Sequence, residues 1–325
     1  MKLVSFSPRG AGGRLLGALL DDAVLELDRA AALLDVPESS PALLAGMESL
    51  LAEWDHGLLV ARETLSRAET AVGASQARVA DLRHPLDQIT LHPPVAQPPS
   101  IRDFYAFETH VRNARARRGL PVPPEWYEIP VFYFSNPGAL LGHGAPVRKP
   151  ASTDALDYEL EIACVIAKKA RDVPAEHWRS VVAGFTVMND WSARDVQRKE
   201  MAVGLGPAKG KDFATSLGPA LVTLDELESA RVEDERHDLA MEARVNGRTL
   251  SRGNARDLHF TFGQMIARAS QDVYLFPGDV IGSGTVGGGC LLELGPEVHP
   301  WLRPGDEVTL EIERLGALSN KIVEA

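Results

Sequence analysis

Two glutamates stand one residue apart in an otherwise apolar segment, ELEIACVIA, residues 159–167. On a β-strand, side chains two residues apart share a face, so Glu159 and Glu161 are expected to point together. Neighbouring carboxylates repel each other, and removing each from water costs several kcal/mol unless its charge is compensated. A protonated carboxyl or a divalent cation would compensate it, whereas an edge strand with one face in water would avoid the problem. All-oxygen donors favour Mg²⁺, Ca²⁺ or Mn²⁺ over zinc.

Polar residues follow abruptly after the strand-like segment GFTV, in MNDWSARDVQ, residues 188–197. The end of a buried strand is a place where a rigid scaffold presents functional side chains, so Asp190 is a candidate third ligand. Arg194 and Gln197 lie three residues apart and would share a face of a helical turn. The alternative is that Asn189 or Asp190 caps a helix that carries solvated charges.

Two glycine-rich segments differ in the chemistry they offer. Residues 204–219 carry Lys211, which a flexible loop could bring close to a substrate oxygen, but Asp212 follows it, so the segment is not a phosphate-binding P-loop. Residues 282–289, GSGTVGGG, lack the strand–helix setting of a dinucleotide fingerprint. We interpret that second segment as close packing of backbone.

Residues 102–119 combine an acid, aromatic residues, a histidine and several arginines. The segment holds Asp103, Tyr105, Glu108 and His110, and a lone histidine such as His110 is more often structural or solvated than catalytic. The run of arginines is typical of a solvated helix face, and in an acidic protein it could instead steer small anionic substrates. It consists of Arg112, Arg115, Arg117 and Arg118.

The elements that must position these residues change character along the chain. Residues 1–27 favour short strands, and residues 28–80 favour two or three helices. Four prolines in residues 91–100 indicate a stiff linker. The sequence therefore predicts an N-terminal α+β domain over 1–92, a Pro-rich linker over 93–100 and a catalytic domain over 101–325.

The catalytic domain is expected to be α+β and mostly β, with antiparallel pairing dominant and few helices. Predicted helices span 175–184 and 260–270. Strands are predicted at 131–134, 159–167, 184–188, 219–224, 239–247, 279–286, 291–294 and 307–316.

Composition narrows the classes of protein. With 34 Lys+Arg against 45 Asp+Glu, the formal charge of −11 disfavours nucleic acid as a partner. No apolar stretch is long enough to span a membrane, and the N-terminus lacks a signal-peptide core. The two cysteines, Cys164 and Cys290, lie in apolar runs and are expected to be buried and unpaired. A reducing cytoplasm is the expected compartment.

Together these segments resemble the fumarylacetoacetate hydrolase family over residues 100–325. The motifs occur in the family's order: DFYAFETH, DYELEIA, MNDWSARDVQ, GKDFATS, GSGT and LLEL. The resemblance implies a mixed β-roll or β-sandwich catalytic domain, a small leading domain and a homodimer.

The resemblance also implies roles for individual residues. The metal, Mg²⁺ before Ca²⁺ or Mn²⁺, would be held by carboxylates, with a lysine and a threonine close by. These are Asp103, Glu159, Glu161, Asp190, Lys211 and Thr215. His110 would be the general base, oriented by Glu293. Arg194, Gln197, Tyr105, Tyr133 and Thr285 match substrate-contacting positions, while Met201 replaces a substrate-binding tyrosine of the animal enzyme.

The activity implied is hydrolysis of a C–C bond in a 1,3-diketo acid, such as fumarylacetoacetate or an acylpyruvate. His110 would activate a water, while Lys211 and Gln197 would stabilise oxyanion charge. Arg194, or an arginine of the 112–118 run, would hold a carboxylate of this small anionic dicarbonyl substrate. A decarboxylase or tautomerase of an oxaloacetate-type acid stays open, because a general base can also move an α-proton. A non-catalytic binding protein is the third alternative.

Overall fold

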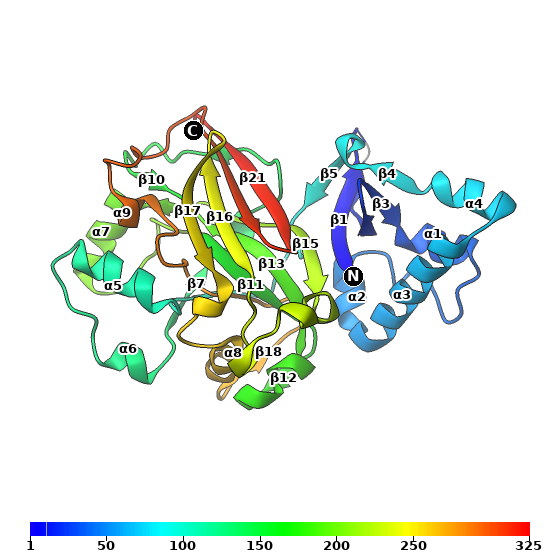
Figure 1. The fold of residues 1–325 in the computed structure, drawn as a ribbon, viewed down its shortest axis with the longest axis horizontal. Coiled ribbons are helices and arrows are strands. Elements are labelled where there is room, and N and C mark those ends of the chain that lie inside the picture. The colour runs from blue at the N-terminus through cyan, green and yellow to red at the C-terminus, as the bar shows by residue number, and fades with distance from the viewer. Residues whose placement is uncertain (11) are drawn as a thin grey trace.

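The computed structural model describes residues 1–10 and 12–325, and a long mixed sheet runs through most of it (Figure 1). From end to end this sheet contains β4 (Arg83–Pro85), β3 (Ala23–Glu26), β2 (Leu15–Leu20), β1 (Lys2–Pro8), β15 (Thr215–Thr223), β13 (Val182–Asp190), β11 (Leu160–Ile166), β19 (Val280–Gly282), β6 (Ile101–Phe104) and β7 (Phe132–Ser135). β5 (Ile89–His92) pairs with β1, and β8 (Leu140–Leu141) pairs with β15.

A second sheet packs against the middle of the first, since β20 and β21 contact β13. It contains β17 (Arg248–Asn254), β16 (Ala240–Val245), β20 (Glu307–Ile312), β21 (Gly316–Val323) and β9 (Val147–Arg148). Two short pairs are β10 (Leu156–Asp157) with β14 (Ser192–Ala193), and β12 (Ala170–Arg171) with β18 (Tyr274–Leu275). Antiparallel pairing dominates, as predicted, and the two sheets enclose much of the apolar core.

The helices lie around the sheets. They are α1 (Leu27–Leu33), α2 (Met47–Ala52), α3 (Trp54–Thr70), α4 (Gly73–Ala80), α5 (Glu108–Ala116), α6 (Glu125–Glu128), α7 (Arg194–Val203), α8 (Phe262–Ser270) and α9 (Leu291–Leu294). Short 3₁₀ helices are η1 (Leu86–Gln88), η2 (Pro137–Ala139), η3 (Ala175–Ser180), η4 (Leu224–Ala230), η5 (Glu233–Glu235) and η6 (Ala255–Asp257). None of the helices within the described residues has the length and apolar character needed to cross a bilayer.

The N-terminal strands continue the sheet of the C-terminal part. β1 pairs antiparallel with β15, with Lys2 opposite Val222, and the first helices lie beside these strands at the end of the molecule away from α5 and α7 (Figure 1). One sheet therefore contains strands from both sides of the proline-rich segment. The division into domains 1–92 and 101–325 stays a prediction.

Several predicted elements differ from the structure. The strand predicted over 279–286 ends at Gly282, and the region 28–80 contains the four helices α1 to α4 in place of two or three. Residues 291–294 form helix α9 and not a strand, because the buried carboxylate of Asp157 accepts the N–H groups of Leu291 and Leu292 and so caps the turn. The helix predicted over 175–184 stops at 180, and β13 begins at 182. The strand predicted over 307–316 ends at 312, and β21 starts at 316 after Arg314 adopts a φ of 67°.

Candidate active site

Neighbouring strands of the long sheet bring the predicted acidic ligands together. Asp190 ends β13 opposite Thr215 of β15, and β13 is followed in the sheet by β11, which carries Glu161. Across β19, Gly282 pairs with Asp103 of β6. Because β11 has a strand on each side, it is not an edge strand, and the alternative of a solvated glutamate pair is excluded.

The four carboxylates form a compact, buried cluster. One oxygen from each of Asp103, Glu159, Glu161 and Asp190 lies within 4.8 Å of the others. Glu161 and Asp190 are 0% exposed, and Glu161 Oε2 and Asp190 Oδ1 have no hydrogen-bond partner among the described residues. Buried charged oxygens without partners are costly unless a cation satisfies them. This all-oxygen donor set therefore fits a hard divalent cation.

Four carboxylates lie so close together in the buried cluster that their negative charges would repel one another. Burial raises the pKa of Glu161 well above its usual value, and the charges of Asp103 and Glu159 raise it further. Burial likewise raises the pKa of Asp103 well above its usual value. For Glu159, burial also acts to raise the pKa, but the cations Lys211 and Arg194 outweigh it, so the pKa is lowered. The cluster thus combines an ionised carboxylate with others that favour a proton or a metal.

Two buried cations of the chain already contact the cluster. Lys211 Nζ lies 2.5 Å from Asp190 Oδ2 and also donates to Glu159. Arg194 donates Nη2 to Glu159 at 2.7 Å and Nε to Asp157 at 2.8 Å, and its Nη1 lies 3.1 Å from Gln197 Oε1. The structure brings all these predicted residues together. In this state the guanidinium of Arg194 is engaged by the chain itself, and its contact with substrate stays a prediction.

The hydroxyl groups predicted at the site lie at the carboxylates. Tyr133 donates its hydroxyl proton to Asp190 Oδ2 at 2.6 Å. The Thr285 hydroxyl lies 3.4 Å from Glu161 Oε1, and the Thr215 hydroxyl is 3.1 Å from that of Ser135. The Tyr133 and Thr285 hydroxyls thus contact the cluster, whereas the Thr215 hydroxyl contacts Ser135. The substrate contacts of Tyr133 and Thr285 and the place of Thr215 beside the metal stay predictions.

The glycines of residues 282–289 hold Asp103 in place. Gly284 donates its backbone N–H to Asp103 Oδ1 at 3.1 Å. A Cβ at Gly282 would lie 2.5 Å from the same oxygen, closer than any side chain permits. The prediction of close backbone packing is confirmed, and its effect is to let a carboxylate approach the sheet.

A histidine–glutamate pair lies in a second buried cluster. His110 on α5 is 2.5 Å through Nδ1 from Glu293 Oε1 on α9. Burial acts to raise the pKa of Glu293, but the hydrogen bond from His110 outweighs it, so the pKa is lowered. A charged Glu293 accepts the Nδ1 proton, which leaves the lone pair on Nε2. The ring of Tyr105 lies 5.2 Å from that of His110, edge to face, and burial raises the pKa of Tyr105 to about 12.

Two residues that contact these groups were missed in the sequence. Asn113 donates to Glu293 Oε2 at 2.8 Å, and it follows His110 by three residues, the spacing that puts both on one face of a helix. Asp157 binds Arg194 and the N-terminus of α9, and it precedes Glu159 by two residues, the spacing of one strand face. In both cases the spacing was a usable signal. Both cysteines are buried and unpaired, as predicted, and Cys290 Sγ lies 3.5 Å from Glu293 Oε1.

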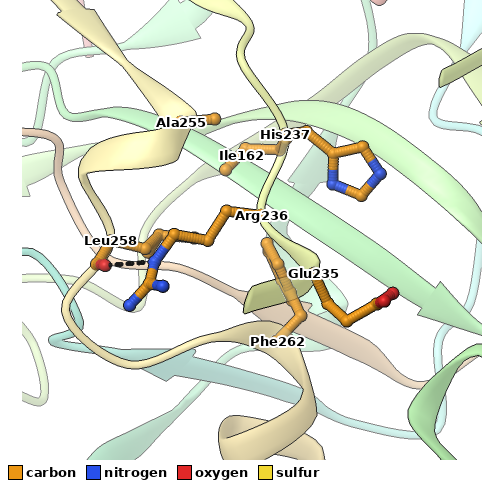
Figure 2. A pocket seen from close by; sticks show the side chains of 7 residues that line it. All are labelled: Ile162, Glu235, Arg236, His237, Ala255, Leu258 and Phe262. Carbon is orange, nitrogen blue, oxygen red and sulfur yellow. Dashed lines mark hydrogen bonds between the residues drawn. The ribbon is translucent and has the colours of Figure 1, made fainter. Parts of the chain in front are cut away.

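A small cavity of about 10 Å³ lies elsewhere, and Figure 2 shows the side chains around it. Ile162 of β11 lines it, and Ile162 points to the face of the sheet opposite Glu161. The cavity has room for about one water molecule and is separate from the carboxylates. Its lining consists of Ile162, Glu235, Arg236, His237, Ala255, Leu258 and Phe262.

Comparison with known proteins places this arrangement in a family. A model described as fumarylacetoacetate (FAA) hydrolase, C-terminal, matches residues 100–323. A mitochondrial oxaloacetate tautomerase of Homo sapiens is 32% identical over 325 residues, covering 99% of this chain and 92% of that protein. An oxaloacetate tautomerase of Bacillus subtilis is 29% identical, covering 94% and 95%.

A solved structure shows the same fold. Maleylpyruvate hydrolase from Sphingobium sp. SYK-6, in complex with manganese(II) and pyruvate, matches with a TM-score of 0.68 and 26% identity, covering 100% of both chains. The described fold, the ordered motifs and the family model agree. The chain therefore belongs to the fumarylacetoacetate hydrolase family.

Proposed function

We propose that this chain is a metal-dependent tautomerase that interconverts the keto and enol forms of a small 2-oxo dicarboxylate of the oxaloacetate type. The supporting observation is a buried His110–Glu293 pair together with a four-carboxylate centre, in a chain 32% identical over almost its full length to an oxaloacetate tautomerase. Among the activities that the sequence leaves open, the named relatives favour this one over hydrolysis.

The acidic cluster would hold the cation, for which we propose Mg²⁺; the manganese complex of the maleylpyruvate hydrolase makes Mn²⁺ the first alternative. When bound, such a cation supplies Lewis acidity to the oxygens of a dicarbonyl. Lys211 neutralises part of the charge on Glu159 and Asp190, which keeps the buried site from repelling an anionic substrate.

His110 would move the proton. Its Nε2 takes a proton from the carbon between the two carbonyl groups, while Glu293 holds the Nδ1 proton and stabilises the imidazolium. The imidazolium then returns that proton to the substrate oxygen, which yields the enol. The reverse sequence yields the ketone, and no water is consumed. The neutral phenol of Tyr105 beside the imidazole is a further donor for a substrate oxygen.

Hydrolysis of an acylpyruvate is the second candidate. The maleylpyruvate hydrolase of the same fold favours it, because that enzyme is named as a hydrolase and is 26% identical in sequence to this chain. The same His110 would then remove a proton from water in place of carbon. The two candidates differ in whether a C–C bond breaks.

The test compares both reactions in one preparation loaded with Mg²⁺ or Mn²⁺. Decay of the enol absorbance of oxaloacetate should accelerate without formation of pyruvate, and acylpyruvates should not be cleaved at a comparable rate. Replacing His110 by Asn should slow tautomerisation by about 100-fold or more while metal binding is retained. The matched control is His177→Asn on an exposed histidine. Faster cleavage of an acylpyruvate than tautomerisation of oxaloacetate would reject the proposal in favour of hydrolysis.

A further inference from the structure

Asp157 lies between the two halves of the site and touches neither the carboxylate cluster nor His110 directly. Its side chain is 0% exposed and accepts three hydrogen bonds, which come from two directions. Oδ1 accepts the N–H of Leu291 at 2.7 Å, and Oδ2 accepts the N–H of Leu292 at 3.0 Å. Oδ2 also accepts Arg194 Nε at 2.8 Å. One carboxylate thus joins the start of α9 to the guanidinium of α7.

The helix that Asp157 caps is too short to hold itself in place. α9 has four residues, a single turn, and a single turn is not stable without outside contacts because helix nucleation is unfavourable. Within the described residues, Cys290, the residue before the helix, offers no side-chain cap. The cap therefore comes from Asp157, which is far away in the chain. α9 carries Glu293, so the cap fixes the backbone from which Glu293 reaches His110.

The other side of Asp157 leads to the metal ligands. The guanidinium that it holds through Nε donates Nη2 to Glu159 Oε1 at 2.7 Å. A continuous series of contacts therefore runs from His110 through Glu293 and α9 to Asp157, and on through Arg194 to Glu159. In Figure 1, α5, α7, α9 and β10 gather on one side of the sheets.

We propose that Asp157 is a positioning residue that sets the placement of the His110–Glu293 pair relative to the carboxylate cluster. It acts through α9 on one side and through Arg194 on the other. A carboxylate is suited to this task because it accepts on both oxygens, and the three groups that hydrogen-bond to it are all donors. The expected effect of Asp157 on the reaction rate rests on the proposed tautomerase function. The expected effect of Asp157 on the His110–Glu293 hydrogen bond does not.

Asp157→Asn is the direct test, because asparagine keeps the shape but turns one acceptor into a donor that faces either the helix N–H groups or the guanidinium. We expect the rate of oxaloacetate tautomerisation to fall at least tenfold, with the affinity for Mg²⁺ changed less than threefold. The double variant Asp157→Asn with Glu293→Gln should be within twofold of Glu293→Gln alone, since no ionised His110–Glu293 pair is then left for Asp157 to place relative to the carboxylate cluster. Independent, multiplying losses would contradict the proposal.

A spectroscopic readout tests the same point without any assay of activity. The Nδ1 proton of His110, shared with Glu293, should give a downfield proton NMR signal that is absent in His110→Asn. In Asp157→Asn this signal should shift or disappear. If the wild-type chain does not act on oxaloacetate, the tautomerase proposal fails, and this signal still decides the role of Asp157.

The matched control is Asp306→Asn. Asp306 is also buried, and it accepts the N–H of Arg303 at 2.9 Å and the amide of Asn246 at 2.8 Å, outside the site. The Asp306→Asn variant should have a lower thermal midpoint but an unchanged rate of tautomerisation and an unchanged NMR signal from the His110 Nδ1 proton. If Asp157→Asn does not fold, Asp157→Glu keeps the charge and both acceptors and displaces α9 by its extra methylene. A folded Asp157 variant with the wild-type rate and signal would overturn the proposal.

Discussion

Glu161 and Asp190 show at the scale of single residues why the site requires a cation. Each keeps one buried carboxylate oxygen that no donor reaches within the described part of the chain, although Lys211 lies 2.5 Å from the other oxygen of Asp190. The pKa of Glu161 and that of Asp103 are raised, first by burial and then by neighbouring carboxylates. Protons and metal therefore compete for the same oxygens.

This competition predicts that metal binding releases protons. The raised pKa values favour protonation of Glu161 and Asp103 in the metal-free protein. Mg²⁺ must therefore displace these protons, and the affinity for Mg²⁺ should rise with pH. The same shift makes the metal-free fold less stable as pH rises through the raised values. Calorimetric titration in two buffers of different ionisation enthalpy measures the release.

The companion variant is Glu161→Gln, which should weaken Mg²⁺ binding by about 100-fold, comparable to the larger losses seen at metal sites. Glu26→Gln is the control, because Glu26 is a buried carboxylate that contacts Arg29 and His84 away from the site. A binding heat that does not depend on the buffer would argue against displaced protons. Unchanged metal affinity in Glu161→Gln would remove that residue from the ligand set.

At the scale of elements, β19 decides how closely Asp103 can approach its neighbours. Gly282 pairs with Asp103 across the parallel β19–β6 ladder, and the position of a side chain at 282 is occupied by the Asp103 carboxylate. Met188 of β13 closes the other side of that space, 3.0 Å from the same position. A glycine is needed here for space and not for an unusual backbone angle.

Gly282→Ala should therefore displace Asp103 and weaken metal binding by about 10-fold, with a loss of stability of about 1–3 kcal/mol from overpacking. Metal titration followed by thermal unfolding with and without Mg²⁺ measures both effects. In Gly46→Ala, the new methyl group would meet its nearest atom at an ordinary 3.6 Å, so this variant should bind metal like the wild type. Equal affinity in the two variants would show that Asp103 does not depend on Gly282.

The elements also show what the sequence could and could not predict. The Glu159–Glu161 spacing correctly predicted that the two carboxylates point together, although Glu159 immediately precedes β11 and only Glu161 lies within it, because the alternation of side chains is a local property. The apolar letters LLEL equally fit a strand, and they form a helix only because Asp157, 134 residues earlier, accepts the N–H of Leu291. Local pattern cannot reveal a cap supplied from such a distance. The assembly of Asp103 beside Glu161 likewise depends on sheet order, which local patterns do not give; Asp103 was assigned to the ligand set from the resemblance and not from spacing.

At the scale of the whole molecule, His237 makes the fold sensitive to acid. It packs edge-on against Phe185, with ring centres 5.3 Å apart, and its Nε2 is buried without a partner among the described residues. Burial, together with the nearby charge of Arg179, lowers the pKa of His237 to about 4. The unfolded chain binds a proton more readily, so stability should fall as pH drops from 6.5 towards 4.

The free energy of unfolding should fall by up to about 3 kcal/mol, which lowers the thermal midpoint by roughly 4 °C for a chain of this length. His237→Phe keeps a ring among the aromatic neighbours and cannot take up a proton, so its midpoint should fall less between pH 7.5 and 4.5. The comparison is the difference between variant and wild type, since other groups titrate in the same range. Parallel curves for the two proteins would exclude His237 as the source.

The exposed end of the long sheet bears on the assembly of the molecule. β7 ends the sheet, and within the described residues its outer edge has no strand partner. Phe134 on β7 is 65% exposed, and Ile129 and Val131 before it are 40% exposed. An apolar, unpaired edge invites a second strand. We therefore place the predicted homodimer contact at β7.

If the predicted homodimer forms through β7, Phe134→Lys should leave a monomer of 35.2 kDa, because it puts a second charge next to Arg102, which lies over the Phe134 ring in the wild type. Sedimentation velocity measures the mass. Phe276→Lys is the comparison, since Phe276 is also exposed but lies outside β7. A wild-type protein that sediments as a monomer, or a variant that remains dimeric, would contradict this placement.

The pairing of β1 with β15 limits how the chain can be divided in the laboratory. β15 carries Thr215 at the site, and the backbone of Thr223 at its other end donates to the carbonyl of Met1. A fragment cut at the proline-rich segment would begin near residue 101 and would leave the β1 side of β15 with bare N–H and C=O groups, an open template for aggregation. The smallest unit worth expressing, fusing or transplanting is therefore the whole chain, even if only its later residues carry the chemistry.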